Sequence, residues 1–355
     1  MKYGLMFFGG HCASGRDRYR LVLEAARFAD DHGFAAVWTP ERHFDDFGGI
    51  FPNPSLLGAA LAVITRRVQI RAGSLIAPLH DPVRIAEDWS VVDNLSSGRV
   101  AISFGSGWNV NDFIFFPDRY ANRRSIMFEQ IDLVQRLWRG DPVVRTNSYG
   151  KQVDIALRPR PFQAALPFWV TSSGNPETFA AAGEIGANVL THMIGQDLAA
   201  LRSKIETYRA ARAAHGHAGP GVVTLMLHTF LGEDLERVRA EVYQPFREYL
   251  RAAVALETRA ASGGGAISGG HKVPAHDIPP DMLEELLDLT FERYFQTAAL
   301  MGTSESCRET VERFREAGVD EIACLIDFGV DPDSVLASLV HLHRLQETTA
   351  AAGHH

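Results

Sequence analysis

The chain has 355 residues, 46% of them hydrophobic, and its 35 basic and 43 acidic side chains give a net charge of −8. A chain of this length can bury on the order of three quarters of its unfolded surface, so a large core is expected. The acidic balance argues against nucleic-acid or anionic-membrane partners. Three dispersed cysteines, Cys12, Cys307 and Cys324, are typical of reduced thiols in a cytoplasmic protein, not of a disulfide framework.

The sequence also bears on signal peptides, transmembrane helices and metal sites. The N-terminal apolar run has no cleavage-site pattern, so no signal peptide is expected. No stretch approaches 18 consecutive apolar residues, so no transmembrane helix is expected. The 14 histidines do not cluster with carboxylates at metal-ligand spacing, and we therefore expect no metal site.

Short apolar runs alternate with amphipathic segments along the chain. The predicted strands are 3–8, 35–38, 68–74, 100–104, 168–171, 188–191, 222–230 and 322–327. The predicted helices are 19–32, 55–64, 82–95, 122–138, 176–185, 197–215, 233–257, 281–300, 304–317 and 332–346. This alternation indicates a parallel sheet with helices packed against it.

Eight such strands favour a closed (β/α)8 TIM barrel over an open doubly wound sheet, which is the structural alternative. A barrel needs roughly 250 residues, so on the order of a hundred are left for insertions. We expect insertions at 140–167 and 260–280. The second is glycine-rich and predicts a mobile, lid-like loop, because glycine tracts lose much entropy on ordering. With no sign of a second core, we expect a single domain over residues 1–350.

The end of the second predicted strand carries three ionisable residues in a row. Glu41, Arg42 and His43 stand between Trp38 and Phe44, where the strand gives way to a loop rich in glycine and proline. Catalytic groups of barrels collect at this edge, and aromatic neighbours lower the local dielectric and shift pKa values. A surface ion pair between Glu41 and Arg42, with a structural His43, is the plainer interpretation. Three such groups at one strand end favour catalysis.

The predicted strand 168–171 is followed by a loop with the composition of an anion site. Its sequence is Ser172-Ser173-Gly174-Asn175-Pro176, in which Asn175 suits a helix N-cap and Pro176 the first helical position. Free N–H groups and the helix dipole favour a phosphate there, and barrels often bind phosphate in this half. An ordinary strand-to-helix turn has the same residue types, so the pattern alone leaves both interpretations open.

A second glycine-containing loop, Gly105-Ser106-Gly107-Trp108-Asn109, follows the fourth predicted strand. Its glycines permit close approach of the backbone to a ligand, and Trp108 either offers a stacking face or plugs the barrel mouth. The third glycine and the following helix of a dinucleotide fingerprint are missing.

Taken in order, these segments resemble the bacterial luciferase-like monooxygenase family, from Met1 to about Gly195 and again near 318–329. The chain is most similar to its natural-product oxygenases. The matching phrases are Trp-Thr-Pro-Glu-Arg-His-Phe at 38–44, Pro-Asn-Pro at 52–54, Pro-Leu-His-Asp-Pro-Val-Arg at 78–84, Leu-Ser-Ser-Gly-Arg at 95–99, Gly-Ser-Gly-Trp-Asn at 105–109 and Arg-Pro-Arg-Pro-Phe-Gln at 158–163.

The resemblance implies a barrel that binds reduced FMN delivered by a separate flavin reductase. Reduced FMN would react with O2 to a C4a-hydroperoxide, which oxygenates a small-molecule or carrier-protein-bound substrate. A homodimer or homotetramer is implied as well. Two alternatives remain open: a deazaflavin (F420)-dependent oxidoreductase on the same barrel, and a catalytically inactive flavin-binding protein.

The resemblance also places cofactor-binding residues. A cis peptide beneath the flavin ring maps to Gly73 and Ser74, and the phosphate loop to Ser172, Ser173 and Gly174. Thr191 and His192 border the flavin. Ser106, with Trp108 nearby, falls where luciferases keep an arginine near the phosphate. We therefore expect Arg123 or Arg124 to supply the missing charge.

The departures from luciferase concern the catalytic residues. Luciferase has two adjacent histidines after the glutamate, the first of them catalytic, whereas this chain has Arg42 and then His43; luciferase also has a cysteine at the position of Gly105. A permanent cation can steady a peroxide anion but is a poor base. We expect Arg42 to steady that anion, His43 to relay a proton and Glu41 to orient both. Asn53 and Phe44 are expected on the substrate side, and light emission is not expected.

Overall fold

The structure, a computed structural model, describes residues 1–9, 17–262 and 279–351. Eight parallel strands form a continuous sheet from β9 through β11 and β1 to β8. The sheet closes into a barrel because its last strand, β8, also pairs with its first, β9. The predicted (β/α)8 barrel is therefore confirmed, and the open sheet is excluded. In barrel order the strands are β1 (Lys2–Met6), β2 (Ala36–Thr39), β3 (Gln69–Ile76), β4 (Val100–Gly105), β7 (Phe168–Thr171), β8 (Asn188–His192), β9 (Val223–Gly232) and β11 (Glu321–Leu325).

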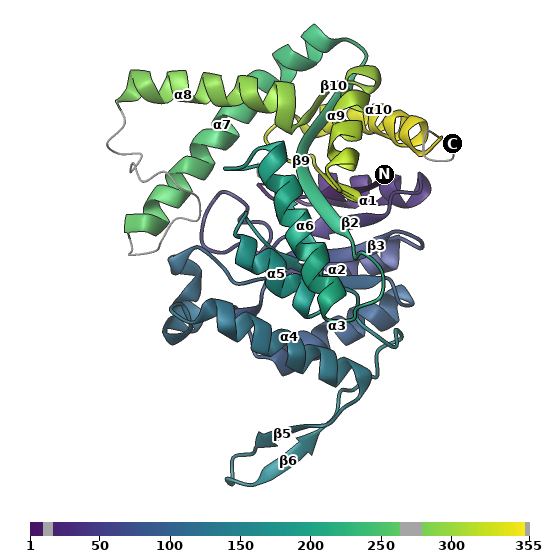
Figure 1. The fold of residues 1–355 in the computed structure, drawn as a ribbon, viewed down its shortest axis with the longest axis vertical. Helices are drawn as coiled ribbons and strands as arrows, with labels where there is room; N and C mark the ends of the chain where they lie inside the picture. Colours follow the sequence, from purple (N-terminus) through teal and green to yellow (C-terminus); the bar gives the residue numbers. More distant parts are fainter. Residues whose placement is uncertain (10–16, 263–278, 352–355) are drawn as a thin grey trace.

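Helices connect the strands and surround the barrel (Figure 1). Local sequence sets several of their starts: Asn53, Asp81 and Asn175 cap helices that begin with proline. The helices are α1 (Arg20–Asp31), α2 (Pro54–Ile64), α3 (Pro82–Ser96), α4 (Arg123–Arg139), α5 (Pro176–Glu184), α6 (Leu198–Ala214), α7 (Leu235–Ser262), α8 (Pro280–Arg293), α9 (Ser304–Glu316) and α10 (Pro332–Ala351).

The predicted helix at 281–300 is wrong in its last part. α8 ends at Arg293, a π-helical turn spans Tyr294–Ala298, and a short strand, β10 (Leu300–Thr303), follows. β10 extends the sheet by pairing with Thr229–Gly232 of β9, beyond the part of β9 that pairs with β11. A strand of four residues is too short to show the alternating apolar pattern of a strand. Its apolar residues were therefore assigned to the preceding helix.

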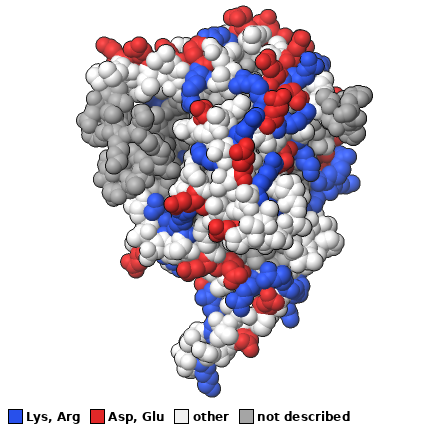
Figure 2. All heavy atoms as spheres, viewed as in Figure 1, with Lys and Arg blue, Asp and Glu red and all other residues white. Residues whose placement is uncertain are grey.

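The two expected insertions differ in what the structure describes. Segment 140–167 contains an antiparallel hairpin of β5 (Val143–Thr146) and β6 (Gln152–Ile155), which projects from the barrel (Figure 1). Figure 2 shows it as a narrow protrusion below a face on which basic and acidic side chains are mixed. For the expected loop at 260–280, α7 runs to Ser262 and residues 263–278 lie outside the described part of the chain.

Buried side chains close the N-terminal end of the barrel. Nη1 of Arg71 lies 2.6 Å from Oε1 of Glu321, and the guanidinium packs against the rings of Trp38 and Trp169 at 4.6 and 4.4 Å. Such a buried ion pair is tolerated because each charge has its partner. This end is packed, and the C-terminal strand ends are left to carry a site.

Two of the three cysteines can be placed. Cys307 and Cys324 are buried free thiols, and burial raises the pKa of each to about 12. Cys12 lies outside the described residues. Within the described part of the chain, no helix is long and apolar enough to cross a membrane.

Candidate active site

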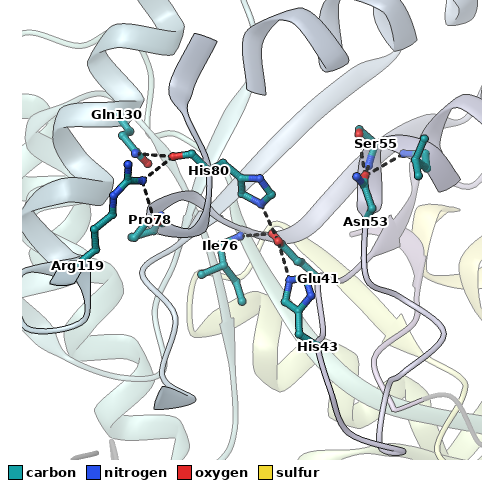
Figure 3. Close-up of polar contacts among 10 residues, drawn as sticks. Glu41, His43, Asn53, Ser55, Ile76, Pro78, His80, Arg119 and Gln130 are labelled. Carbon is teal, nitrogen blue, oxygen red and sulfur yellow. Dashed lines mark hydrogen bonds and ion pairs between the residues drawn. The ribbon is translucent and has the colours of Figure 1, made fainter. Parts of the chain in front are cut away.

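The C-terminal ends of β2 and β3 place a carboxylate between two imidazoles (Figure 3). Oε1 of Glu41 accepts hydrogen bonds from Nε2 of His43 at 2.9 Å and from Nε2 of His80 at 2.6 Å. Its Oε2 accepts from the N–H of Ile76 at 2.7 Å. Because a carboxylate only accepts, both Nε2 atoms carry a proton, and Nδ1 is the atom through which each histidine can exchange one. We call Glu41, His43 and His80 the histidine cluster.

The cluster favours the charged form of Glu41. Burial opposes ionisation, but the hydrogen bonds from His43, His80 and Ile76 outweigh it and hold the pKa of Glu41 below its usual value. Burial likewise opposes the charge of His80, but its hydrogen bond to Glu41 and the charge of that carboxylate raise the pKa of His80 above its usual value. The Glu41 side chain is fully buried, which rules out the surface interpretation.

His80 was not predicted as a site residue, although it lies in the matched phrase at 78–84. Its backbone is held from two sides: its carbonyl accepts from Nη1 of Arg119 at 2.7 Å and from Nε2 of Gln130 at 3.0 Å. Arg119 also donates to the carbonyl of Pro78 at 3.0 Å (Figure 3). One sequence signal could have identified His80. It lies just after the third strand, and in a barrel the third strand pairs with the second strand, which carries Glu41.

Among the described residues, no ion pair joins Glu41 and Arg42. Glu41 is directed toward the end of β3, whereas the guanidinium of Arg42 lies over the rings of Phe8 and Phe47, at 4.4 and 5.0 Å from their centroids. Successive side chains of an extended segment point to opposite sides, which explains the separation. Arg42 is only 8% exposed, and its Nη2 has no hydrogen-bond partner among the described residues.

A second buried carboxyl group, Asp112, lies near the histidine cluster and was also missed. It belongs to a 3₁₀ turn (Val110–Phe115) after β4, where Nδ2 of Asn109 donates to it at 2.9 Å. Burial raises the pKa of Asp112 to about 6, although the charges of His43 and Arg42 act in the opposite direction. Asp112 therefore exchanges a proton near neutral pH. One Asp in a turn carries no sequence signal for this.

Phe44 and Phe115 flank His43 with aromatic rings. Their centroids both lie 5.4 Å from the imidazole and 5.6 Å from each other. Phe44 is 61% exposed and has a φ of +57°, in the left-handed region that costs a non-glycine residue on the order of 1 kcal/mol. Strained residues of this kind gather at functional sites, which is in keeping with the predicted substrate-side position of Phe44.

Asn53 has a structural task in the described chain. Its Oδ1 accepts from the N–H groups of Ser55 and Leu56 at 2.9 and 3.1 Å and from the Ser55 hydroxyl at 2.7 Å, which caps α2 (Figure 3). This cap accounts for the residue without a ligand. A contact of Asn53 with substrate stays a prediction.

The ends of β3, β4 and β7 are joined by hydroxyl groups. Oγ1 of Thr171 lies 2.6 Å from Oγ of Ser74 and 2.6 Å from Oγ of Ser103. The Gly73–Ser74 peptide is cis, as predicted. A Cβ on Gly73 would lie 2.9 Å from the Trp38 ring, so this strand end requires glycine. Ser106 and Trp108 follow β4 at the same rim, and Trp108 is 38% exposed.

The loop after β7 leads into α5 through a helix N-cap, and phosphate binding there stays a prediction. Oδ1 of Asn175 caps α5 through the N–H of Glu177 at 2.8 Å, and Pro176 takes the first helical position. Gly174 has a φ of +114°. Ser172 is buried beside it, and Ser173 is exposed. We call residues 172–175 the anion loop.

A cation at this loop that was not predicted is Lys204 of α6. A Cβ on Gly174 would stand 3.2 Å from its Nζ. Of the expected cations, Arg123 donates to the carbonyls of Gly107 and Tyr120, and Arg124 pairs with Glu177 at 2.9 Å beside the loop. Lys204 lies about 30 positions further along the chain, and only the packing of α6 against α5 brings it here.

Thr191 and His192 are connected to Lys204 through Gln196. Nζ of Lys204 donates to Oε1 of Gln196 at 2.8 Å, and Nε2 of Gln196 donates to Oγ1 of Thr191 at 3.4 Å and to the carbonyl of His192. Burial, with a smaller effect of the Lys204 charge, lowers the pKa of His192 to about 4, so this imidazole is neutral at pH 7. Its Nδ1 accepts from the N–H of Ile194 at 3.1 Å, which puts the ring proton on Nε2.

Two curated relatives are monooxygenases. The 4-hydroxyprotoasukamycin monooxygenase of Streptomyces nodosus subsp. asukaensis is 33% identical over 171 residues, which is 48% of this chain and less than half (46%) of that protein. The oxygenase component of the flavin-dependent trigonelline monooxygenase of Acinetobacter baylyi is 24% identical over 331 residues, 90% of this chain and 87% of that protein.

Solved structures share the fold. Monooxygenase RslO1 from Streptomyces bottropensis has a TM-score of 0.79 at 22% identity and covers 98% and 99% of the two chains. The oxygenating constituent of 3,6-diketocamphane monooxygenase from Pseudomonas putida, in complex with FMN, has a TM-score of 0.74 at 19% identity, covering 97% of each chain. An F420-dependent secondary alcohol dehydrogenase has a TM-score of 0.71 at 17% identity, covering 98% of each.

The low identities of these structures make them evidence for the fold alone. The sequence model of one family gives more specific evidence than these structures. The model of the luciferase-like monooxygenase family matches residues 1–321 of this chain. The chain therefore belongs to the luciferase-like monooxygenase family.

Proposed function

We propose that this protein is the oxygenase component of a cytoplasmic two-component monooxygenase. It would bind reduced FMN delivered by a separate flavin reductase and use O2 to oxygenate an organic substrate of natural-product biosynthesis, either free or bound to a carrier protein. The observation that carries the proposal is the histidine cluster, a buried carboxylate that orients two imidazoles on the rim that also holds the anion loop. Both relatives described above are named as monooxygenases.

The residues of the rim fit FMN. The N-terminus of α5, the anion loop and Lys204 together offer N–H groups, hydroxyls and a cation, which is the donor set that a phosphate requires. Ser74, Ser106, Trp108, Thr191 and His192 would line the ring. When bound, reduced FMN supplies the electrons that activate O2.

The chain's own residues would control protons and water. Glu41 holds Nε2 of His43, so that Nδ1 of His43 is positioned to give or take a proton. Asp112, with a pKa of about 6, is suited to exchange that proton near neutral pH. Phe44 and Phe115 would exclude water on the substrate side of His43.

An F420-dependent oxidoreductase is the second candidate, because an F420-dependent dehydrogenase shares the barrel. FMN and F420 binding should be compared on the full chain by fluorescence titration, followed by turnover under ¹⁸O2 with reductase. We expect preference for FMN and one ¹⁸O atom in the product. Preference for F420 with hydride transfer in the absence of O2 would establish the alternative, and FMN binding without any substrate-dependent product would indicate an inactive flavin-binding protein.

We further propose that the chain forms a homo-oligomer through the outer face of α2 and α3. Four apolar side chains on these helices are 45–71% exposed: Leu56, Val63, Val91 and Leu95. Such exposed apolar groups mark interfaces when they lie together. Light scattering should show a dimer or tetramer that Val63→Asp together with Leu95→Asp dissociates. A monomeric wild-type chain would refute this.

A further inference from the structure

Arg42 is a buried cation with an unused donor. Its Nη2 has no hydrogen-bond partner among the described residues, although a guanidinium has five N–H donors. Arg71, buried to a similar degree, donates to Glu321 at 2.6 Å and to Gln69 at 2.6 and 2.9 Å. An unmatched buried donor is costly, so its presence at a strand end of the active rim requires a reason.

The acidic groups near Arg42 do not satisfy it. Burial lowers the pKa of Arg42, and the charges of Asp112, Asp45 and Asp327 oppose this effect, while Nη2 keeps no hydrogen-bond partner among the described residues. Each already accepts from another group: Asp112 from Asn109, Asp45 from the N–H of Phe47, and Asp327 from the N–H groups of Phe8 and Gly9. Their charges help to keep the guanidinium ionised, while the donor group at Nη2 stays available.

The loop around Arg42 is shaped to hold the side chain. Gly48 has a φ of +83°, and a Cβ there would lie 2.8 Å from Cγ and 3.0 Å from Nε of Arg42. The backbone N–H of Arg42 donates to the carbonyl of Phe51 at 2.9 Å. With Phe8 and Phe47 against the guanidinium, the fork is fixed in a low-dielectric setting.

We propose that Arg42 binds a carboxylate of the substrate and thereby selects anionic substrates. This inference rests on the proposed function in placing the substrate beside the histidine cluster. A rigid guanidinium fork matches the two oxygens of a carboxylate. The guanidinium lies over the rings of Phe8 and Phe47 and not beside Glu41, so it would serve a different part of the ligand from the histidines. The role expected from the sequence, in which Arg42 steadies an oxygen-derived anion, stays a prediction.

The test compares benzoate with benzamide, which have similar shapes but differ in charge. Binding to the FMN-loaded full chain is measured by calorimetry for wild type, Arg42→Gln and Arg42→Lys. We expect wild type to prefer benzoate, and Arg42→Gln to weaken benzoate binding roughly 10- to 100-fold with benzamide changed less than about threefold. Arg42→Lys should restore only part of the preference, because it lacks the fork.

A matched control is Arg84→Gln on α3, whose side chain is 66% exposed and pairs with Glu87 and Asp88. It should leave both affinities unchanged. Failure of wild type to prefer benzoate, or equal benzoate affinity in wild type and Arg42→Gln, would overturn the proposal.

Two further measurements separate this inference from the proposed function. Oxidation of reduced FMN by O2 without substrate is compared in wild type and Arg42→Gln; a change in that rate, with the benzoate preference retained in the variant, would assign Arg42 to oxygen chemistry instead. If wild type binds no FMN, the proposed function fails, whereas the benzoate preference can still be measured on the flavin-free protein.

Discussion

The histidine cluster and the anion loop lie on one rim but are built in opposite ways. Glu41 is fully buried and accepts three hydrogen bonds, so its geometry is set before any ligand arrives. The anion loop relies on backbone groups, an exposed Ser173 and the long side chain of Lys204. The side assigned to chemistry is thus rigid, whereas the side assigned to cofactor binding can adapt to its ligand. Substitutions should therefore affect stability at the first and affinity at the second.

The largest effect is expected for Glu41→Gln. The amide removes a buried charge from two histidines, and with its oxygen in the place of Oε1 its NH2 group faces the N–H donor of Ile76. Removing one partner of a buried ion pair costs about 3–5 kcal/mol, and loss of a positioned group costs on the order of 10²–10³ in rate. Urea unfolding and product formation measure both. Glu177→Gln, in an exposed pair with Arg124, is the control and should change stability by less than about 1 kcal/mol. Equal stability of the Glu41 variant and wild type would contradict the view that the histidine cluster is more rigid than the anion loop.

Asp112→Asn should stabilise the protein, in contrast to Glu41→Gln, and the size of the stabilisation should depend on pH. The folded pKa of Asp112, about 6, exceeds the ordinary value of 3.8, so between these values the folded state keeps a proton that the unfolded state has lost. Stability of the wild type therefore falls as pH rises through this window. We expect the variant to be more stable by about 1–3 kcal/mol at pH 8, with the gain gone below pH 4. A gain that stays constant across urea unfolding at pH 4, 6 and 8 would contradict the assignment.

At the anion loop, Lys204→Gln should change affinity while stability stays nearly constant. Loss of one charge-assisted contact to phosphate should raise the Kd for FMN about tenfold and leave riboflavin, which lacks the phosphate, unaffected. Fluorescence titration of both flavins measures this. Arg202→Gln, on the same helix with its Nη2 on the carbonyl of Glu316, is the matched control. Equal weakening for both flavins would place Lys204 outside the phosphate site.

The smallest effect on stability is expected for Ser74→Ala, a substitution located between the histidine cluster and the anion loop. The variant loses the hydrogen bond to Thr171 at 2.6 Å, while Thr171 keeps its bond to Ser103. We expect a loss of about 1 kcal/mol in thermal unfolding, with the histidine cluster intact. Loss of His43-dependent activity in this variant would show that the two regions are coupled.

Sequence patterns were more informative for the elements than for the contacts. The eight barrel strands were predicted because each is an apolar run with its own flanking turn, whereas β10 was missed because four residues cannot establish a period. Glu41 and His43 were predicted together because they are two positions apart. His80 and Lys204 were missed because each comes from an element distant in the sequence from the residue it joins.

The sequence by itself determined the barrel, the rim and the position of the anion loop, because periodicity, caps and proline positions are local properties of the chain. Only the tertiary structure decided that His43 and His80 share one oxygen of Glu41 and that Arg42 is directed away from them. It also decided that Lys204 reaches Gly174. The physical reason is that these contacts join neighbouring strands and helices whose approach depends on closure of the whole barrel, which no local pattern encodes.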